Sequence, residues 1–276
     1  MNAHTLWLHG LSIIAPGMPD WAHAAPVLRG EQAWAHAPSV LPPADALPAA
    51  ERRRASRAVR VALGLGLHAL QGHDPGEIAT VFTSSGADGH NCHALCEQLA
   101  GEDRAISPTR FHNSVHNAAA GYWGIATRSM APSQVLCAHD ASLGAGWIDA
   151  LGQLACDGGE LLLVAYDSEY PEPLHTCRPI PDAAGAAFWL GTEPREHSLG
   201  TLRTTLVPDA ADPMAQAPLD GLRTDFPALR SLPLLERIAR RDDRPVVLDY
   251  LSSQRLRVQF TPADHDHLRP HPARSA

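Results

Sequence analysis

The sequence predicts an α/β protein with a layered fold. Segments with the composition of strands alternate with helix-like segments up to about residue 191, and this alternation is typical of a sheet covered by helices. The run "ELLLVAYD" at 160–167 is apolar without regular alternation, which indicates a strand covered on both faces. With 276 residues, of which 45% are apolar, the chain can bury a substantial core.

A strand and a long helix are predicted in the N-terminal part. The segment "TLWLHGLSIIAPG" at 5–17 is a short apolar strand that ends in a Pro-Gly turn. A connector rich in Pro and Ala follows at 38–48. Residues 48–72 are predicted to form one helix that ends at Gly72, because they carry an apolar stripe at helical spacing: Val59, Leu63, Leu67 and Leu70.

More strands and helices are predicted between this helix and residue 191. Residues 77–89 are a buried strand that runs into a Ser/Gly turn, and 91–101 form the next helix. Residues 107–127 have the composition of a loop that enters a helix of small residues. The stretch "VLCAHDASLGAGWIDA" at 135–150 combines an apolar run, a tight turn and a helix, which is the shape of a nucleophile elbow. Residues 183–191 are another strand.

The C-terminal part is predicted to be smaller. After a polar break, residues 201–208 form a strand, and 217–260 contain a helix between two strands. We therefore expect residues 1–191 to form the main layered unit, 192–262 a shortened strand-helix-strand unit, and 263–276 a flexible tail rich in Pro and His.

Composition excludes several classes of partner and chemistry. The net charge of −8 offers no basic face for nucleic acid. No apolar run reaches the roughly 18 residues that a membrane span needs, and the N-terminus lacks the basic flank of a secretory signal. Five cysteines, an odd number, fit reduced thiols. We therefore expect no membrane insertion and a cytoplasmic location.

The chain contains no lysine, since all 22 basic residues are arginines. This excludes a Schiff-base lysine, a P-loop lysine and a lysine general base. The absence of a GxSxG motif argues against an α/β-hydrolase.

The densest cluster of potential metal ligands does not have the spacing of a metal site. "GHNCHALCEQ" contains His90, Cys92, His93 and Cys96. On a helix the two cysteines share a face, but His93 points away and no second pair has zinc spacing. The tail histidines His265, His267 and His271 could bind metal only weakly. We expect neither a metal nor another cofactor.

The tip of the elbow carries a carboxylate where a nucleophile is expected. Asp140 stands within one residue of the tip. His139, Asp140 and Ser142 are neighbours on one turn, so they cannot form the relay of a catalytic triad, whose members converge from separate elements. Cys137 falls inside the strand and is expected to pack in the core without activation.

Four segments in order resemble the N-terminal half of a β-ketoacyl-acyl carrier protein synthase, of the thiolase superfamily. They are "LPAAERRRASRAVRVALGLGLHAL", "IATVFTSSGADG", "ISPTRFHNSVHNAAAGYWGIA" and "APSQVLCAHDASLGAGWIDALGQL". The resemblance covers about residues 3–191 and implies a thiolase-like fold with a complete N-terminal half and a truncated C-terminal half. More narrowly, "FHNSVHNAAAGYWGIAT" and "LLLVAYDSEYP" resemble the short chain-length factors of aryl polyene and xanthomonadin-type clusters.

The resemblance also implies that condensing chemistry has been lost. Active members use an elbow Cys together with two histidines and a lysine from the second half. The elbow here has no Cys at its tip, and the segments that carry the histidines and the lysine are absent. Asp140 replaces the Cys and is expected to cap the helix behind it. Gly144 and Gly146 are expected to let that helix pack closely on the sheet.

By the same resemblance, the loop at 113–117 lies near the dimer interface and the active-site mouth. We expect its polar residues to hydrogen-bond within the loop. The alternative hypothesis is that His116 acts as a catalytic base. The residues concerned are Asn113, Ser114, His116 and Asn117.

The resemblance predicts a non-condensing subunit that pairs with an active ketosynthase and helps to set the length of an acyl chain held on an acyl carrier protein. Arg52, Arg53 and Arg54 are expected either to meet the acidic carrier protein or partner, or to form a solvated face. One alternative is an enzyme with altered chemistry on acyl thioesters that uses Asp140 or His116. Another is a homodimeric scaffold.

Overall fold

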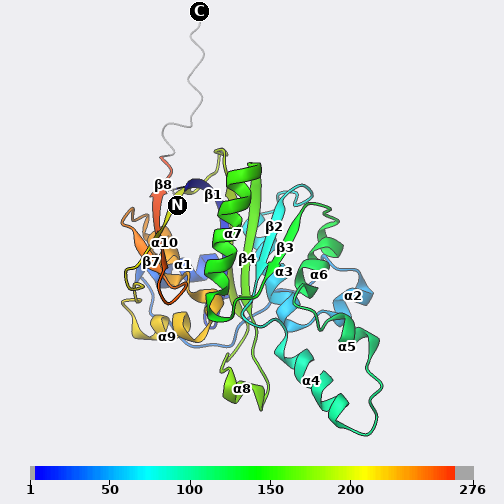
Figure 1. Ribbon diagram of the computed structural model, residues 1–276. Coiled ribbons are helices and arrows are strands. Elements are labelled where there is room, and N and C mark those ends of the chain that lie inside the picture. Colours follow the sequence, from blue (N-terminus) through cyan, green and yellow to red (C-terminus); the bar gives the residue numbers. More distant parts are fainter. Residues whose placement is uncertain (1–3, 265–276) are drawn as a thin grey trace, which may run out of the picture.

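The computed structural model describes residues 4–264, and these form one eight-stranded sheet with helices on both faces (Figure 1). The strands are β1 His4–Ile14, β2 Ala79–Thr83, β3 Ser133–Leu136, β4 Glu160–Asp167, β5 Ala184–Gly191, β6 Gly200–Val207, β7 Val246–Leu248 and β8 Arg255–Pro262. They lie in the order β3-β2-β4-β5-β1-β6-β8-β7. Strand β2 runs parallel to β3 and β4, and the other neighbouring pairs are antiparallel. The predicted α/β layered fold is confirmed.

Ten α-helices and two short 3₁₀ helices accompany the sheet in residues 4–264. The α-helices are α1 Trp21–Arg29, α2 Ala49–Arg54, α3 Arg57–Leu70, α4 Gly89–Ala100, α5 Pro108–His112, α6 Ala118–Thr127, α7 Ser142–Asp157, α8 Leu174–Cys177, α9 Ala217–Asp225 and α10 Leu232–Arg240. The 3₁₀ helices are η1 His139–Ala141 and η2 Pro227–Leu229.

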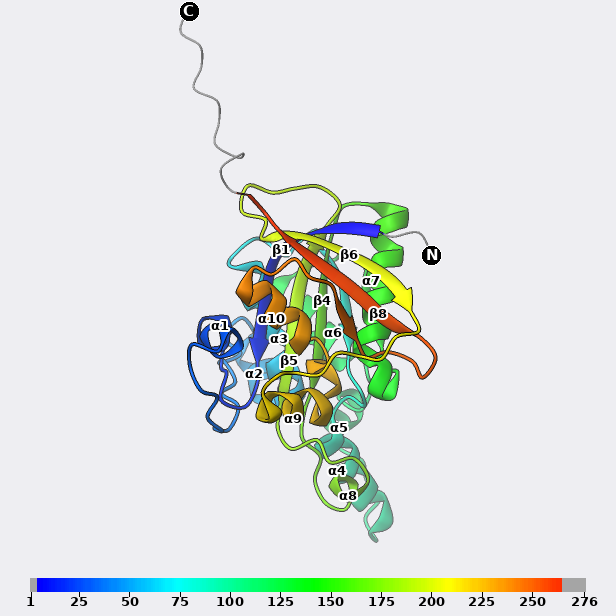
Figure 2. The same ribbon diagram turned by 90° about the vertical axis from the view of Figure 1, so that its left-hand side faces the viewer.

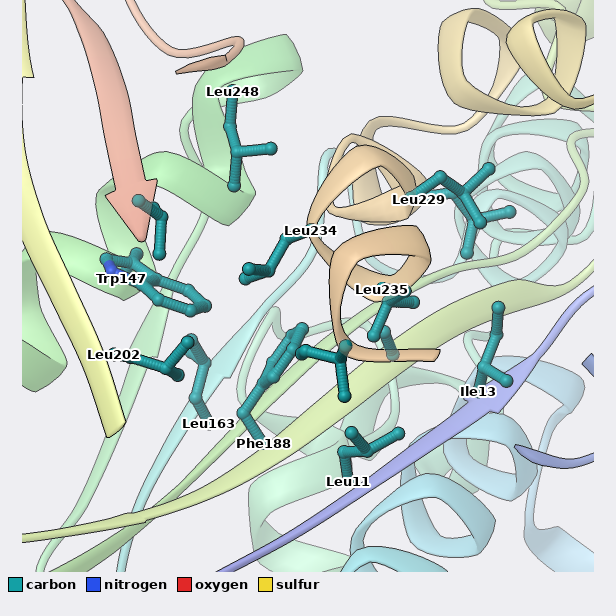
Figure 3. Close-up of a cluster of buried hydrophobic side chains, with 14 of the residues drawn as sticks. Leu11, Ile13, Trp147, Leu163, Phe188, Leu202, Leu229, Leu234, Leu235 and Leu248 are labelled. Atoms are coloured by element: carbon teal, nitrogen blue, oxygen red, sulfur yellow. The ribbon is translucent and has the colours of Figure 1, made fainter. Parts of the chain in front are cut away.

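Strand β4 explains why an apolar run without alternation marks the centre of the sheet. Leu161 and Leu163 belong to the cluster under α1, α7 and α10, whereas Leu162 and Val164 belong to the cluster under α3 and α6. Both faces are therefore covered, as predicted. Figure 3 shows Leu163 and Phe188 beside Trp147 of α7, whose ring lies 5.2 Å from that of Phe188.

The predicted single helix over 48–72 is wrong, because the chain breaks between α2 and α3. Ala55 is extended, and the Ser56 hydroxyl accepts a hydrogen bond from the Val59 N–H at 3.3 Å, which starts a new helix. Arg52, Arg53 and Arg54 consequently occupy the last turn of α2, where the helix dipole favours positive charge. The apolar stripe from Val59 to Leu70 lies wholly within α3, so the periodicity was no evidence for helix over residues 48–56.

The C-terminal part also differs from the prediction, because it contains two helices rather than one. Phe226 is the C-terminal cap of α9 and Pro227 follows it, and a proline cannot continue a helix without losing an N–H bond. Strand β6 pairs with β1, β8 with β6, and β7 with β8. Residues 200–262 therefore extend the same sheet, and Figure 2 shows β6 and β8 running at an angle to β4 and β5.

Most of the predicted tail at 263–276 lies outside the described residues, including His265, His267 and His271. Within residues 4–264, no helix is both long enough and apolar enough to cross a membrane.

Candidate functional site: the elbow after β3

The predicted elbow forms at the end of β3. The strand ends at Leu136, η1 spans the turn, and α7 begins at Ser142. His139 is the left-handed residue of the turn, with φ of 51°, and its side chain is 72% exposed. A strained residue that presents its side chain at a strand-to-helix turn is the tip of an elbow. The tip is therefore His139, one residue before Asp140.

The Ser142 side chain holds the turn together. Its buried hydroxyl accepts a hydrogen bond from the Ala138 N–H at 2.9 Å. The same hydroxyl lies 2.7 Å from the His139 carbonyl oxygen and 2.9 Å from that of Ser84, which share its single proton. Ser142 is thus committed to backbone groups, and no triad forms among these neighbours, as the sequence predicts.

Asp140 does not cap α7, so that expectation is wrong. The helix has Ala141 at its cap position, with no side-chain capping bond. The Asp140 Oδ1 atom instead lies 2.5 Å from Arg178 Nη1, and Oδ2 lies 3.5 Å from Arg230 Nη2. Partial burial would raise the pKa of Asp140, but the hydrogen bond and charge of Arg178 outweigh it and hold the pKa below its usual value. Arg230 also donates to the Asp140 carbonyl oxygen at 2.6 Å.

The His139 imidazole is held by the same arginine. Its Nε2 atom lies 3.0 Å from Arg178 Nη1, and its Nδ1 atom lies 3.5 Å from Asp140 Oδ1. Arginine only donates, so Nε2 accepts and its lone pair is occupied. A base needs that lone pair to take a proton, and a nucleophile needs it to attack. The arrangement therefore leaves the elbow without an activated group.

Cys137 does not pack in the core, contrary to expectation. It follows the last residue of β3, and its side chain is exposed. Partial desolvation of the thiol, followed by the charge of Asp167, raises its pKa. Nucleophilic cysteines need the opposite shift, a lowered pKa.

A buried carboxylate that the sequence did not single out lies beneath the elbow. Asp167 Oδ1 accepts hydrogen bonds from the Ser85 N–H at 2.9 Å and its hydroxyl at 2.6 Å, and Oδ2 accepts from the Ala228 N–H at 2.8 Å. Burial raises the pKa of Asp167, although these hydrogen bonds oppose the shift. Asp167 thereby joins the end of β4, the loop after β2 and η2.

The two elbow glycines serve different neighbours. A Cβ at Gly146 would lie 3.0 Å from Leu163 and from Thr83, so this glycine lets α7 approach the sheet as predicted. A Cβ at Gly144 would lie 2.3 Å from the ring of Tyr250. Gly144 therefore makes room for the C-terminal segment rather than for the sheet.

Within residues 4–264, no hydrogen bond joins the loop at 113–117 to the elbow. Asn113 is buried and donates to the Arg54 carbonyl oxygen at 3.3 Å, and the Ser114 hydroxyl donates to the Phe111 carbonyl oxygen at 2.8 Å. The main chain of Asn117 accepts from the Gly121 N–H at 3.0 Å. His116 is exposed, and within residues 4–264 no hydrogen bond or ion pair holds it. Nothing in this part of the chain positions His116 as a base.

No metal site appears in the described part of the chain. Residues 4–264 contain no group of three His, Cys, Asp or Glu side chains arranged to hold an ion. His93 contacts Glu97 at 3.3 Å instead of the two cysteines of α4.

Comparison with known proteins identifies the family. A family model described as "Beta-ketoacyl synthase, N-terminal domain" matches residues 27–225, well over half of the chain. The chain belongs to the beta-ketoacyl synthase family. No match was found among curated proteins.

Solved structures of beta-ketoacyl synthase relatives share the thiolase-like layered fold. A chain of the ketosynthase ApeO in complex with its chain length factor ApeC, from Xenorhabdus doucetiae, is 22% identical, with a TM-score of 0.71 over 93% of this chain and 99% of that chain. A chain of the ishigamide ketosynthase/chain length factor is 15% identical, with a TM-score of 0.66 over 95% and 100%. A bacillaene ketosynthase from Bacillus amyloliquefaciens is 13% identical, with a TM-score of 0.54 over 75% of this chain and 46% of that chain.

Proposed function

We propose that this protein is a non-condensing ketosynthase-like subunit of the chain-length-factor type. It pairs with an active β-ketoacyl-acyl carrier protein synthase in polyene, fatty-acyl or polyketide biosynthesis. The observation that carries the proposal is the elbow tip, where His139 and Asp140 are held by Arg178 and no thiol is presented. Condensation needs an elbow nucleophile that attacks an acyl thioester. In the proposed pair, the role of this chain is therefore not that nucleophilic attack.

The surface near β3 supports a paired state. Strand β3 is an edge strand, and an open edge offers N–H and C=O groups to a partner. Large apolar side chains are exposed on the neighbouring α5–α6 region and on the loop before β3: Phe111 66%, Val115 50%, Ile125 43% and Met130 95%. Exposed apolar side chains grouped beside an open edge are typical of an interface. We define these four residues together with β3 as the β3 surface.

Residues 192–262 fit a shortened second half attached to an N-terminal half at 1–191. The match to the bacillaene ketosynthase spans less than half of that longer chain. The added strands pack on the elbow helix, since Trp147 Nε1 donates to the Thr204 hydroxyl at 3.1 Å. In this proposal residues 192–262 pack over α7 and carry no catalytic group.

The other partner in the proposal is an acyl carrier protein that delivers the chain to the ketosynthase. We place the assembly in the cytoplasm, because all five cysteines are free thiols, as expected in a reducing compartment. The β3 surface would equally suit a second copy of this chain, and that is why a homodimeric scaffold is the alternative to test.

Co-expression with the cognate ketosynthase tests the proposal. We expect a one-to-one heterodimer by size-exclusion chromatography with light scattering, and no acyl transfer from malonyl or acyl thioesters by this chain alone. Recovery solely as a homodimer that transfers acyl groups by itself would overturn the proposal. Recovery solely as an inactive homodimer would favour the scaffold.

A further inference from the structure

An apolar groove borders α9, on the side of the sheet that carries α1 and α10 (Figure 2). It has a volume of about 550 Å³ and is lined by the turn after β1, by the connector after α1, by the turn before β5 and by α9. Rings make up much of its wall: Trp34, Pro16, Pro38, Pro181 and Pro218. None of these residues belongs to the elbow or to the β3 surface, so an occupant of the groove would not compete with pairing.

The indole ring of Trp34 is held in place on this wall. Its Nε1 atom donates to the Pro16 carbonyl oxygen at 3.0 Å, and its ring lies 5.9 Å from the ring of His36 in an edge-on arrangement. Aromatic-lined grooves bind segments in the polyproline II conformation, because proline rings pack on the aromatic faces and the stiff segment loses little entropy. The wall of the groove therefore favours a proline-rich ligand.

A free carboxylate also lines the groove. Asp225 ends α9 and is exposed, and within residues 4–264 its side chain has no ion pair or hydrogen bond. The other acidic residue of the lining, Asp182, is already held by Arg57 at 2.5 Å and by the Ser39 N–H at 2.7 Å. The dipole of a helix opposes negative charge at its C-terminal end. A cation in front of Asp225 is therefore favoured, and the ligand should carry positive charge beside its prolines.

A segment of this chain that lies outside the described residues combines these two properties. It comprises residues 265–276, "HDHLRPHPARSA", in which Arg269 and Arg274 flank Pro270 and Pro272. The segment comes shortly after β8, which ends at Pro262. Its composition matches both the ring-lined wall of the groove and the free carboxylate.

The point from which this segment starts is tied to α10 and α1. Arg241 follows α10 and donates to the Ala263 carbonyl oxygen at 2.8 Å. The preceding residue, Arg240, donates to the Leu28 carbonyl oxygen at 3.2 Å. Ala263 therefore lies near the C-terminal end of α1.

The same end of α1 adjoins the groove. Gln216 donates to the Val27 carbonyl oxygen at 3.4 Å, and Pro218, two residues further on, lines the groove. An extended chain advances about 3.3 Å per residue, so the seven steps from Ala263 to Pro270 can span about 23 Å. That is longer than α1, whose nine residues rise about 14 Å. The segment is therefore long enough to reach the groove of its own molecule.

We propose that residues 265–276 dock into this groove within the same molecule, with Pro270 and Pro272 packed on Trp34 and an arginine of the segment facing Asp225. Tethering raises the effective concentration of the segment to the order of millimolar, so a weak intrinsic affinity is enough for occupancy. While it is docked, the segment closes the groove to other proline-rich peptides. The docking does not depend on the pairing proposed above.

Fluorescence anisotropy of a labelled peptide with the sequence of residues 262–276 tests the docking on the full chain. The variant Arg269→Glu/Arg274→Glu, here called the tail variant, should release its own segment. We expect it to bind the peptide at least tenfold more tightly than the wild type does, because the tethered segment of the wild type competes. A peptide with Pro270→Gly/Pro272→Gly should bind the tail variant at least tenfold more weakly, because it lacks the rings and the stiffness of the prolines.

A charge exchange tests whether the peptide binds in the groove. Added to the tail variant, Asp225→Arg should weaken binding of the wild-type peptide at least fivefold and strengthen binding of a peptide with Arg269→Glu/Arg274→Glu. Asp225 is exposed at a helix C-terminus, where positive charge is favoured, so the melting temperature should not fall. The control Glu193→Arg reverses an exposed acidic residue outside the groove lining and should leave both affinities unchanged.

Three results would overturn the proposal. One is equal affinity of the wild type and the tail variant for the peptide, which includes the absence of binding to either. Another is binding that Asp225→Arg leaves unchanged. The third is exclusion of the peptide by the wild type only at concentrations at which light scattering shows a dimer, because the segment of a second copy would then occupy the groove.

Discussion

Arg178 Nη1 lies 2.5 Å from Asp140 Oδ1 and so fixes the carboxylate next to the elbow tip. The arginine comes from the segment between β4 and β5, whereas Asp140 follows β3. The same guanidinium nitrogen also reaches His139 Nε2. One donor therefore occupies both groups that an enzyme with altered chemistry would need at this position.

Removing the carboxylate should affect stability and not activity. We expect Asp140→Ala to lower the free energy of unfolding by about 1 kcal/mol or less, because the side chain is 45% exposed and solvent screens the ion pair. Urea unfolding measures this change. An acyl-thioester assay should show no turnover in either protein, and a rate in the wild type that the variant loses would contradict the account.

Asp167→Asn should be much more damaging. Each carboxylate oxygen accepts from a donor, so an amide places its NH₂ group against either Ser85 or the Ala228 N–H. Leaving such a buried donor unsatisfied costs about 2 kcal/mol or more. Urea unfolding of Asp167→Asn beside the exposed control Asp157→Asn checks this. Equal stability of the two variants would show that the buried network contributes little.

His9 should make stability depend on pH. It is buried against Trp189 and hydrogen-bonds Ser198, and desolvation lowers its pKa from 6.5 to about 4. Because the folded state disfavours the charged ring, the stability that the neutral His9 ring contributes is complete above pH 6.5. It is lost as pH falls from 6.5 towards 4. At pH 5 we expect the free energy of unfolding to be about 2 kcal/mol lower than at pH 7.5.

The measurement compares the wild type with His9→Phe by urea unfolding at both pH values. The variant has no titrating ring at this position and should show a smaller difference between pH 7.5 and pH 5. An equal difference in the two proteins would assign the pH dependence to other groups.

The β3 surface should control pairing with the ketosynthase. Met130 is 95% exposed, so Met130→Glu should leave the melting temperature unchanged. In an interface the new carboxylate would be desolvated without a partner, which is costly. Co-purification should therefore fall at least tenfold. The matched control Leu251→Glu changes a residue that is 43% exposed and lies outside the β3 surface, and it should pair as the wild type does.

The sequence predicted the features that depend on local pattern. The apolar run at 160–167 identified a strand covered on both faces, and the small residues around 139–146 identified the elbow. Those signals come from hydrophobic burial and turn chemistry, which act over a few residues. Gly146 was likewise correctly expected to admit the close approach of α7.

The features that were missed depend on contacts across the chain. Arg178 and Arg230 lie 38 and 90 residues from Asp140, and their sequence context gives no sign that they meet it. A local rule therefore assigned Asp140 to a helix cap. Asp167 did leave a signal, since it is an acidic residue at the end of a fully apolar strand. The break at Ser56 was also missed, because the apolar stripe begins only at Val59 and carries no information on the residues before it.

In the proposed pair, this chain carries no acyl group while its partner does. Intact-mass spectrometry of the co-purified pair, after incubation with an acyl-carrier-protein thioester, measures this directly. We predict an acyl adduct on the ketosynthase and an unmodified mass for this chain. An adduct on this chain, lost in the Asp140→Ala or His139→Ala variant, would contradict the account.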